Sequence, residues 1–243
     1  MIKIFLAVFL FITGGYFSQA QTNKITRYKK TSAMIPMRDG IKLYTVILSP
    51  VDAKGKMPLL IKRTPYGADF PVPDDSTFSA NMLDTALANE GYIFVVQDIR
   101  GKYKSEGTMQ IHQPLIHLVQ KGAIDESTDT WDVVDWLIKN VPNNNGKAGI
   151  YGISYGGWLA LVGAVDPHPA LKASSEQACM GDLFLGDDFH HNGAFRLSYG
   201  MEYTYEVEFD KTTDSDFPFP QYDLFDWYLK LGPLTNVNAK YFH

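Results

Sequence analysis

A serine between two glycines, at the junction of an apolar run and a helix-like segment, constrains the fold most. The motif Gly152-Ile153-Ser154-Tyr155-Gly156 overlaps the end of the run 148–152, which predicts a short buried strand. It opens the segment 156–165, whose apolar spacing predicts a helix. A turn this tight forces the serine into a strained conformation, and the flanking glycines are expected where a Cβ would clash with the neighbouring strand or helix.

That strand, turn and helix give the motif G-x-S-x-G a chemical meaning. In this context it is typical of α/β-hydrolases, and it predicts Ser154 as a nucleophile that attacks an ester or amide carbonyl. The helix N-terminus is directed at the serine, so the backbone N–H of Tyr155 can receive the oxyanion that forms. The alternative is a glycine-rich turn that only packs. The strand before it and the helix after it favour the nucleophile.

The rest of the pattern predicts an α/β fold with a mostly parallel sheet and helices on both faces. Residues 31–48 alternate around Arg38-Asp39-Gly40 and predict a β-hairpin. Interior strands are expected over 59–62, 92–97, 148–152 and 171–174, and helices over 78–89, 127–140 and 156–165. Ser127 or Thr128 is the expected N-cap of the second helix, and Pro142 ends it.

The first twenty residues are expected to be a cleaved signal peptide. Lys3 supplies a positive start, residues 4–12 are apolar, and Ser18-Gln19-Ala20 offers small residues for cleavage. An uncleaved anchor is the alternative, but Thr13-Gly14-Gly15 interrupts a run that is already short for a membrane span. The sequence therefore predicts export to the periplasm or the exterior, with no stable membrane insertion after cleavage.

Composition narrows the classes of partner. The net charge of -5 is spread along the chain without a basic stripe, which argues against nucleic acid. Cys179 is the only cysteine, so an intramolecular disulfide is impossible, and we assign it no chemistry. Neither metal-ligand spacing nor a dinucleotide or phosphate loop is present, so no metal and no cofactor are expected. The oligomeric state stays open, a homo-oligomer included.

The pattern changes after about residue 176. Residues 181–228 are rich in aromatic and acidic side chains and show no clear periodicity. We expect residues 21–176 to be the N-terminal part of an α/β-hydrolase domain. Residues 177–243 would be the start of a helical lid (cap) inserted over the sheet.

Motifs spread over residues 30–200 resemble one group of serine hydrolases. They are Arg63-Thr64-Pro65-Tyr66-Gly67, Gln97-Asp98-Ile99-Arg100-Gly101-Lys102-Tyr103, Thr130-Trp131-Asp132-Val133-Val134-Asp135-Trp136-Leu137, the stretch 151–157, Val165-Asp166-Pro167-His168-Pro169, and the segments 180–190 and 193–196. They stand in order and at plausible spacing. The chain resembles the α-amino acid ester hydrolases, which belong with cocaine esterase, glutaryl acylase and X-Pro dipeptidyl-peptidase.

The resemblance implies roles for four residues. Ser154 matches the nucleophile, Tyr155 supplies one oxyanion donor through its backbone N–H, and the phenol of Tyr66 supplies the other. Asp188 matches a carboxylate that holds the substrate's free ammonium group, with Phe184 and Phe189 as aromatic neighbours. Where the ester hydrolases carry glutamate after the Ser-Tyr pair, this chain has Gly156. The implied function is cleavage of esters or amides of α-amino acids, or related acyl groups, through an acyl-enzyme on Ser154.

Length limits the resemblance, because the family is about twice as long as this chain. Its catalytic aspartate and histidine follow the lid, and a jelly-roll domain follows them. We therefore expect the triad Asp and His, the C-terminal part of the fold and the jelly-roll to be missing, and the fragment alone to be inactive.

The remaining candidates for the acid and the base receive structural roles. His168 is expected to cap or pack, and His190 and His191 to line the lid or the cleft. Asp98 is expected to form a structural salt bridge with Arg100.

Two alternatives to the ester hydrolase remain. One is X-Pro dipeptidyl-peptidase or glutaryl acylase-like activity. The other is a catalytically inactive remnant or binding domain. The expected ligand is a small ester, amide or short peptide.

Overall fold

A computed structural model describes residues 25–186, 188–213 and 215–241. The expected signal peptide (residues 1–20) and His243 lie outside these ranges. The main sheet has the order β4-β1-β2-β5-β3-β6-β7. Its strands are β1 (Arg27–Pro36), β2 (Lys42–Pro50), β3 (Met57–Thr64), β4 (Thr77–Ser79), β5 (Ile93–Asp98), β6 (Asn144–Ile153) and β7 (Leu171–Gln177). The segments that connect them contain α1 (Thr85–Glu90), α2 (Glu126–Asn140), α3 (Tyr155–Gly163) and the 3₁₀ turns η1 (Ala80–Met82) and η2 (Ile116–Leu118).

The strand pairing confirms a mostly parallel α/β sheet. β5, β3, β6 and β7 pair in parallel, whereas β1 and β2 form the expected antiparallel hairpin with Met34 opposite Tyr44. The hairpin turn closes with a 2.8 Å bond from the N–H of Met37 to the carbonyl of Ile41. The parallel strands therefore end together at one edge of the sheet, where ligands of open α/β sheets commonly bind.

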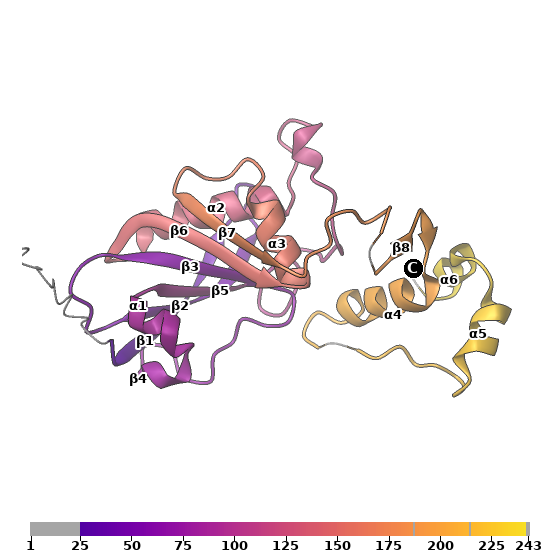
Figure 1. The fold of residues 1–243 in the computed structure, drawn as a ribbon, viewed down its shortest axis with the longest axis horizontal. Coiled ribbons are helices and arrows are strands. Elements are labelled where there is room, and N and C mark those ends of the chain that lie inside the picture. Colours follow the sequence, from indigo (N-terminus) through magenta and orange to yellow (C-terminus); the bar gives the residue numbers. More distant parts are fainter. Residues whose placement is uncertain (1–24, 187, 214, 242–243) are drawn as a thin grey trace, which may run out of the picture.

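Helices cover both faces of the sheet, as expected. In β5, Ile93 and Val95 pack into the cluster that contains Leu137 of α2. Phe94, which points to the opposite face, packs with Ala88 of α1. Figure 1 shows α2 and α3 on one side of the strands and α1 on the other.

The expected helix over residues 78–89 is partly wrong. Its first residues form β4, an edge strand that pairs with β1, and α1 begins only after Asp84, whose side chain caps it. Phe78 is buried on this strand, with its ring 6.1 Å from that of Tyr28. This aromatic contact with a distant strand outweighs the local helical spacing.

The expected caps of α2 are also wrong, because Asp125 is the N-cap. Its carboxylate accepts hydrogen bonds from the N–H groups of Ser127 and Thr128, at 3.2 and 3.1 Å. The hydroxyl of Thr128 accepts in turn from the N–H of Asp125, which completes a capping box. The hydroxyl of Ser127 donates to the carbonyl of Val165 instead.

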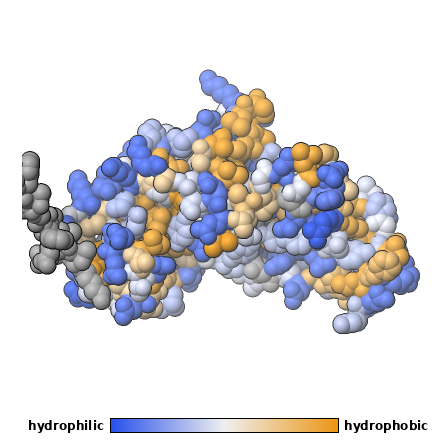
Figure 2. Space-filling view, viewed as in Figure 1, coloured by the Kyte–Doolittle hydropathy of each residue, from blue (hydrophilic) through white to orange (hydrophobic). Residues whose placement is uncertain are grey.

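Residues 178–241, here called the helical region, lie beyond the carboxyl ends of β6 and β7 (Figure 1). The region contains β8 (His190–His191), β9 (Ala194–Phe195), α4 (Leu197–Glu208), α5 (Leu224–Leu231) and α6 (Leu234–Tyr241). It has a core of its own, formed by Met201, Tyr205, Phe217, Trp227, Leu231 and Val237. Figure 2 shows hydrophobic surface near its far end, where Phe225 and Leu229 of α5 are exposed.

Within the described ranges, no helix combines the length and the apolar character needed to cross a bilayer.

Candidate active site

Ser154 occupies the turn between β6 and α3 in the strained conformation that the sequence predicts. Its φ and ψ are 57° and -123°, in a region that residues other than glycine rarely adopt. Two backbone hydrogen bonds hold the turn. The N–H of Ser154 donates to the carbonyl of Gln177 at 2.9 Å, and the N–H of Trp158 donates to the carbonyl of Ser154 at 3.0 Å. Ser154 is exposed, at the edge of the sheet where the parallel strands end.

Two glycines make this turn possible, and one of them is not the expected one. A Cβ on Gly152 would lie 2.0 Å from the carbonyl oxygen of Gly156, and a Cβ on Gly157 would lie 2.4 Å from that of Gln177. A Cβ on Gly156 would meet only the carbonyl oxygen of Arg63, at an ordinary 3.6 Å. The steric requirement therefore falls on Gly152 and Gly157, and the expectation for Gly156 is wrong.

Tyr66 lies at the same edge of the sheet as Ser154. It follows β3, which pairs in parallel with β6 so that Ile61 lies opposite Ile150, and the ends of these two strands carry Tyr66 and Ser154. Tyr66 is 42% exposed, and its hydroxyl lies 2.7 Å from that of Tyr203 on α4. The topology thus brings Tyr66 to the strand end next to the one that carries Ser154.

The loop that carries Tyr66 is fixed by a buried carboxylate. Asp98, at the end of β5, accepts hydrogen bonds from the N–H groups of Ala68 and Lys104. Burial raises the pKa of Asp98, although both backbone bonds act in the opposite direction. The N–H of Tyr66 donates to the hydroxyl of Thr64 at 3.0 Å. Asp98 therefore orients the loop after β3.

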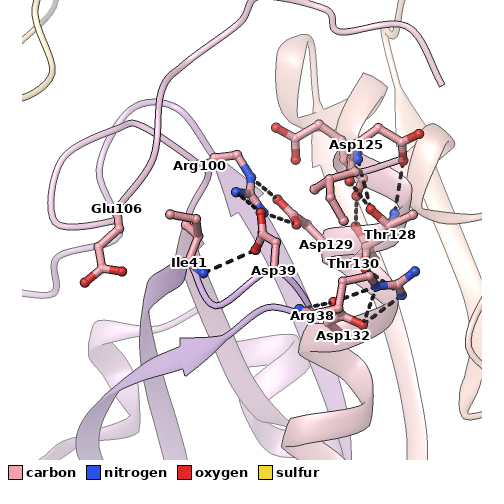
Figure 3. Close-up of polar contacts among 12 residues, drawn as sticks. Arg38, Asp39, Ile41, Arg100, Glu106, Asp125, Thr128, Asp129, Thr130 and Asp132 are labelled. Carbon is pink, nitrogen blue, oxygen red and sulfur yellow. Dashed lines mark hydrogen bonds and ion pairs between the residues drawn. The ribbon is translucent and has the colours of Figure 1, made fainter. Parts of the chain in front are cut away.

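The expected salt bridge between Asp98 and Arg100 is wrong, because Arg100 binds two other carboxylates. Its guanidinium lies 2.7 Å from Asp39 of the hairpin turn and 2.7 Å from Asp129 of α2 (Figure 3). Arg38 of the same turn contacts Asp132 at 2.8 Å. These ion pairs fasten the β1–β2 turn to the first turns of α2.

A buried ion pair lies beneath the loop and α3. Arg63 of β3 is fully buried and contacts the carboxylate of Glu126 at 2.8 Å. It also donates to Gln97 and to the hydroxyl of Thr130, both at 2.8 Å. Burial raises the pKa of Glu126, which Arg63 opposes. The pair links β3 to the start of α2 and supports the strand that ends at Tyr66.

Aromatic rings form a cluster, here called the wall, at the start of α3. Tyr155 is fully buried, and its ring stacks on His112 at 4.6 Å and 21°. The edge of His112 meets Trp158 at 4.9 Å and Phe189 at 5.2 Å, and its ring stacks at 6.5 Å from Tyr203. Burial, followed by the negative potential of Glu126, raises the pKa of Tyr155 well above its usual range. The Tyr155 phenol is therefore a neutral wall residue.

Two members of this wall, His112 and Tyr203, are not singled out by the sequence. His112 lies in a long loop, and Tyr203 lies in a stretch without visible periodicity. The sequence carries no signal that pairs either residue with Ser154, since each reaches the wall through tertiary contacts alone.

The loop after β5 also holds the helical region in place. Lys102, fully buried, donates from Nζ to the carbonyls of Val207 at 2.7 Å and Asp210 at 2.8 Å. The N–H of Tyr103 donates to the carbonyl of Lys211 at 2.6 Å. The C-terminal end of α4 is thus tied to the edge of the sheet where Tyr66 and Ser154 lie.

Asp188, the expected ammonium ligand, lies on the surface of the helical region. Its side chain is 64% exposed and lies 4.0 Å from the guanidinium of Arg196. Of its expected aromatic neighbours, Phe189 is buried against the wall, whereas Phe184 is 61% exposed. A carboxylate this exposed can meet an ammonium group that arrives from solvent.

The histidines with expected structural roles lie as follows. His168 caps and packs as expected: Nδ1 accepts from the N–H of Ala170 at 3.0 Å, and the ring meets Trp131 at 4.7 Å. His190 and His191 form β8, and the ring of His190 lies 5.2 Å from Phe195. Among the residues that the structure describes, no group of three or more His, Cys, Asp or Glu is arranged to hold a metal ion.

Comparison with known proteins places this geometry in a family. The family model described as X-Pro dipeptidyl-peptidase (S15 family) matches residues 39–218. Cocaine esterase of Rhodococcus sp. (strain MB1 Bresler) is 32% identical over 167 residues, which are 69% of this chain and 26% of that protein.

Two solved structures share the fold over most of the chain. An α-amino acid ester hydrolase superposes with a TM-score of 0.74 and 35% identity, covering 95% of this chain and 38% of that one. An aminopeptidase from a marine sediment archaeon of the Thaumarchaeota gives a TM-score of 0.74 and 38% identity, covering 87% and 35%. The chain thus spans about a quarter of the curated relative and somewhat more than a third of each structure. The match over residues 39–218 shows that the chain belongs to the S15 family of X-Pro dipeptidyl-peptidases.

Proposed function

We propose that this protein is a serine hydrolase that cleaves esters or amides of α-amino acids through an acyl-enzyme on Ser154. The observation that carries the proposal is the exposed, strained Ser154 at the N-terminus of α3. The backbone N–H of Tyr155 and the phenol of Tyr66 would donate to the oxyanion. Donors of this kind stabilise the transition state more than the ground-state carbonyl.

The relatives support an acyl substrate with a free amine. The names of the two solved relatives, an aminopeptidase and an α-amino acid ester hydrolase, each describe a substrate that carries an α-amino group. We propose that Asp188 binds that ammonium group and that the helical region is the start of a lid over Ser154. A charge-assisted hydrogen bond from the ammonium group to this carboxylate would favour acyl groups that carry the amine.

Labelling with a fluorophosphonate tests the nucleophile. Because the chain spans little more than a third of its solved relatives, the test uses the full-length protein. We expect the wild type to be labelled and Ser154→Ala to remain unlabelled. A matched control is Ser175→Ala on β7, which removes an exposed hydroxyl from a neighbouring strand and leaves labelling intact. Equal labelling of wild type and Ser154→Ala contradicts the proposal.

Substitution of Asp188 tests the recognition of the amine. We expect Asp188→Asn to raise KM about tenfold for an α-amino acid p-nitrophenyl ester, since a charge-assisted hydrogen bond is lost. Hydrolysis of p-nitrophenyl acetate, which has no amine, stays unchanged. Asp226→Asn on α5 removes a carboxylate that pairs with Lys230 and serves as the charge control. Equal losses on both substrates contradict the role of Asp188.

The family match favours one second candidate, an exopeptidase that releases X-Pro dipeptides. It uses the same nucleophile and also needs a group for the substrate's amino terminus. Turnover of an X-Pro anilide that exceeds that of an amino acid ester would favour the exopeptidase. Binding of the amino acid ester without any turnover would favour a non-catalytic binding protein.

A further inference from the structure

We propose that Tyr203 of α4 is a positioning residue that donates a hydrogen bond to the Tyr66 oxygen and so directs the Tyr66 hydroxyl proton toward the oxyanion. The inference rests on the proposed function, because it gives the Tyr66 phenol its direction. The two hydroxyl oxygens lie 2.7 Å apart, which is a full hydrogen bond. That bond joins a strand end of the sheet to the helical region.

The number of protons on a phenol decides what this bond can do. A phenol has one O–H to donate and lone pairs with which to accept. If Tyr66 donated to Tyr203, its only proton would be used and it could not donate to an oxyanion. With Tyr203 as the donor, the Tyr66 proton is not used in this bond, and a chain of two hydrogen bonds strengthens the donor at its end.

The surroundings of Tyr203 suit a fixed donor. Its ring stacks on Tyr199 at 5.7 Å and 8°, and it lies 5.8 Å from Phe189 and 6.5 Å from His112. Burial, together with the bond to Tyr66, raises its pKa well above the usual range of a phenol. Tyr203 therefore keeps its proton across the working pH range, and its ring has few rotamers open to it.

A double-mutant cycle in the full-length protein tests the assignment. We expect Tyr203→Phe to lower kcat for an α-amino acid p-nitrophenyl ester about tenfold with KM nearly unchanged. Tyr66→Phe lowers kcat about a hundredfold, since an oxyanion donor is lost. In the Tyr66→Phe background, Tyr203→Phe has less than about a twofold effect, because the residue acts only through Tyr66.

A structural role for Tyr203 gives a different pattern. Tyr203→Phe would then lower kcat equally in both backgrounds, or in neither, and either outcome overturns the proposal. The matched control is Tyr228→Phe, which removes another hydroxyl bonded to α4, at the carbonyl of Ser198 and the carboxylate of Glu202. We expect kcat of Tyr228→Phe to stay within about twofold of wild type.

Folding and chemistry are separated by two further measurements. Thermal unfolding followed by circular dichroism establishes that each variant is folded. If Tyr203→Phe does not fold, Tyr203→Met, which also lacks a donor and fills apolar space, takes its place in the cycle. Failure of the proposed function appears as labelling that persists in Ser154→Ala. Failure of this inference appears as Ser154-dependent turnover with no coupling between Tyr203 and Tyr66.

Discussion

The sheet and the helical region bury different kinds of side chain. The central strands bury short runs of mostly aliphatic side chains, such as Ile61, Ile93 and Val95. The helical region buries aromatic rings from separate segments, such as Tyr205 of α4 and Phe217 of the segment between α4 and α5, whose ring centroids lie 5.0 Å apart. Short apolar runs are visible along a sequence, whereas contacts between rings of separate segments are not. The sheet is therefore specified locally and the helical region by tertiary packing.

The largest expected difference comes from glycines that face backbone in the sheet. We expect Gly157→Ala to lower the free energy of unfolding by about 3 kcal/mol or more, because its Cβ would lie 2.4 Å from the Gln177 carbonyl oxygen. Gly156→Ala, where the nearest atom is at 3.6 Å, should cost less than about 1 kcal/mol. Urea unfolding followed by circular dichroism measures both.

The same substitution in the helical region sharpens the contrast. A Cβ on Gly200 would meet the ring of Phe195, a side chain that can move, at 2.3 Å. Gly200→Ala should cost roughly 1 kcal/mol, less than Gly157→Ala. Equal costs at positions 157 and 200 would contradict a rigid sheet beside a more adaptable helical region.

An effect confined to one region is expected from the aromatic core. Trp227→Ala should remove about 3 kcal/mol of packing free energy from the helical region. Hydrogen exchange, followed by mass spectrometry, should then quicken in α4–α6 and stay unchanged in β3, β5 and β6. Leu137→Ala in α2, which faces the sheet core, is the comparison and should quicken exchange in those strands. Uniform quickening by Trp227→Ala would show that the two regions unfold as one.

The smallest expected differences concern helix caps. Asp125→Ala should cost about 1–2 kcal/mol, because this buried side chain accepts two backbone N–H groups of α2 and completes a capping box. Asp223→Ala, which removes a single 3.4 Å cap bond of α5, should cost about 0.5 kcal/mol. Thermal unfolding of both variants measures the difference. A larger loss at Asp223 would reverse the comparison.

Local signals accounted for most of the sheet and for the turn at Ser154. The hairpin, the parallel strands, α2 and α3 were predicted within a few residues, since periodicity and turn residues specify them. The helix predicted to begin at Phe78 was wrong because Phe78 lies in β4, where its ring contacts that of Tyr28. The predicted salt bridge between Asp98 and Arg100 was wrong because these two residues, although close in sequence, bind partners from different elements. Neither partner is visible without the fold.

The candidate site divides in the same way. Ser154 was predicted from its motif between a strand and a helix, and Tyr66 from the family resemblance. Both follow strands that pair in parallel, and parallel strands end together. His112 and Tyr203 could not be predicted, because a loop before Ser154 and helix α4 after it bring them to the wall. Two residues of the candidate site are therefore placed by strand ends, and two by tertiary contacts.

The buried ammonium of Lys102 is bonded to two carbonyls at the end of α4, so it connects the sheet and the helical region by a non-covalent link besides the peptide chain. Proteolytic cleavage of the exposed segment 181–186 would break the peptide chain between the two regions but leave the hydrogen bonds of Lys102 in place. The two fragments should then elute together in gel filtration, because they remain non-covalently associated.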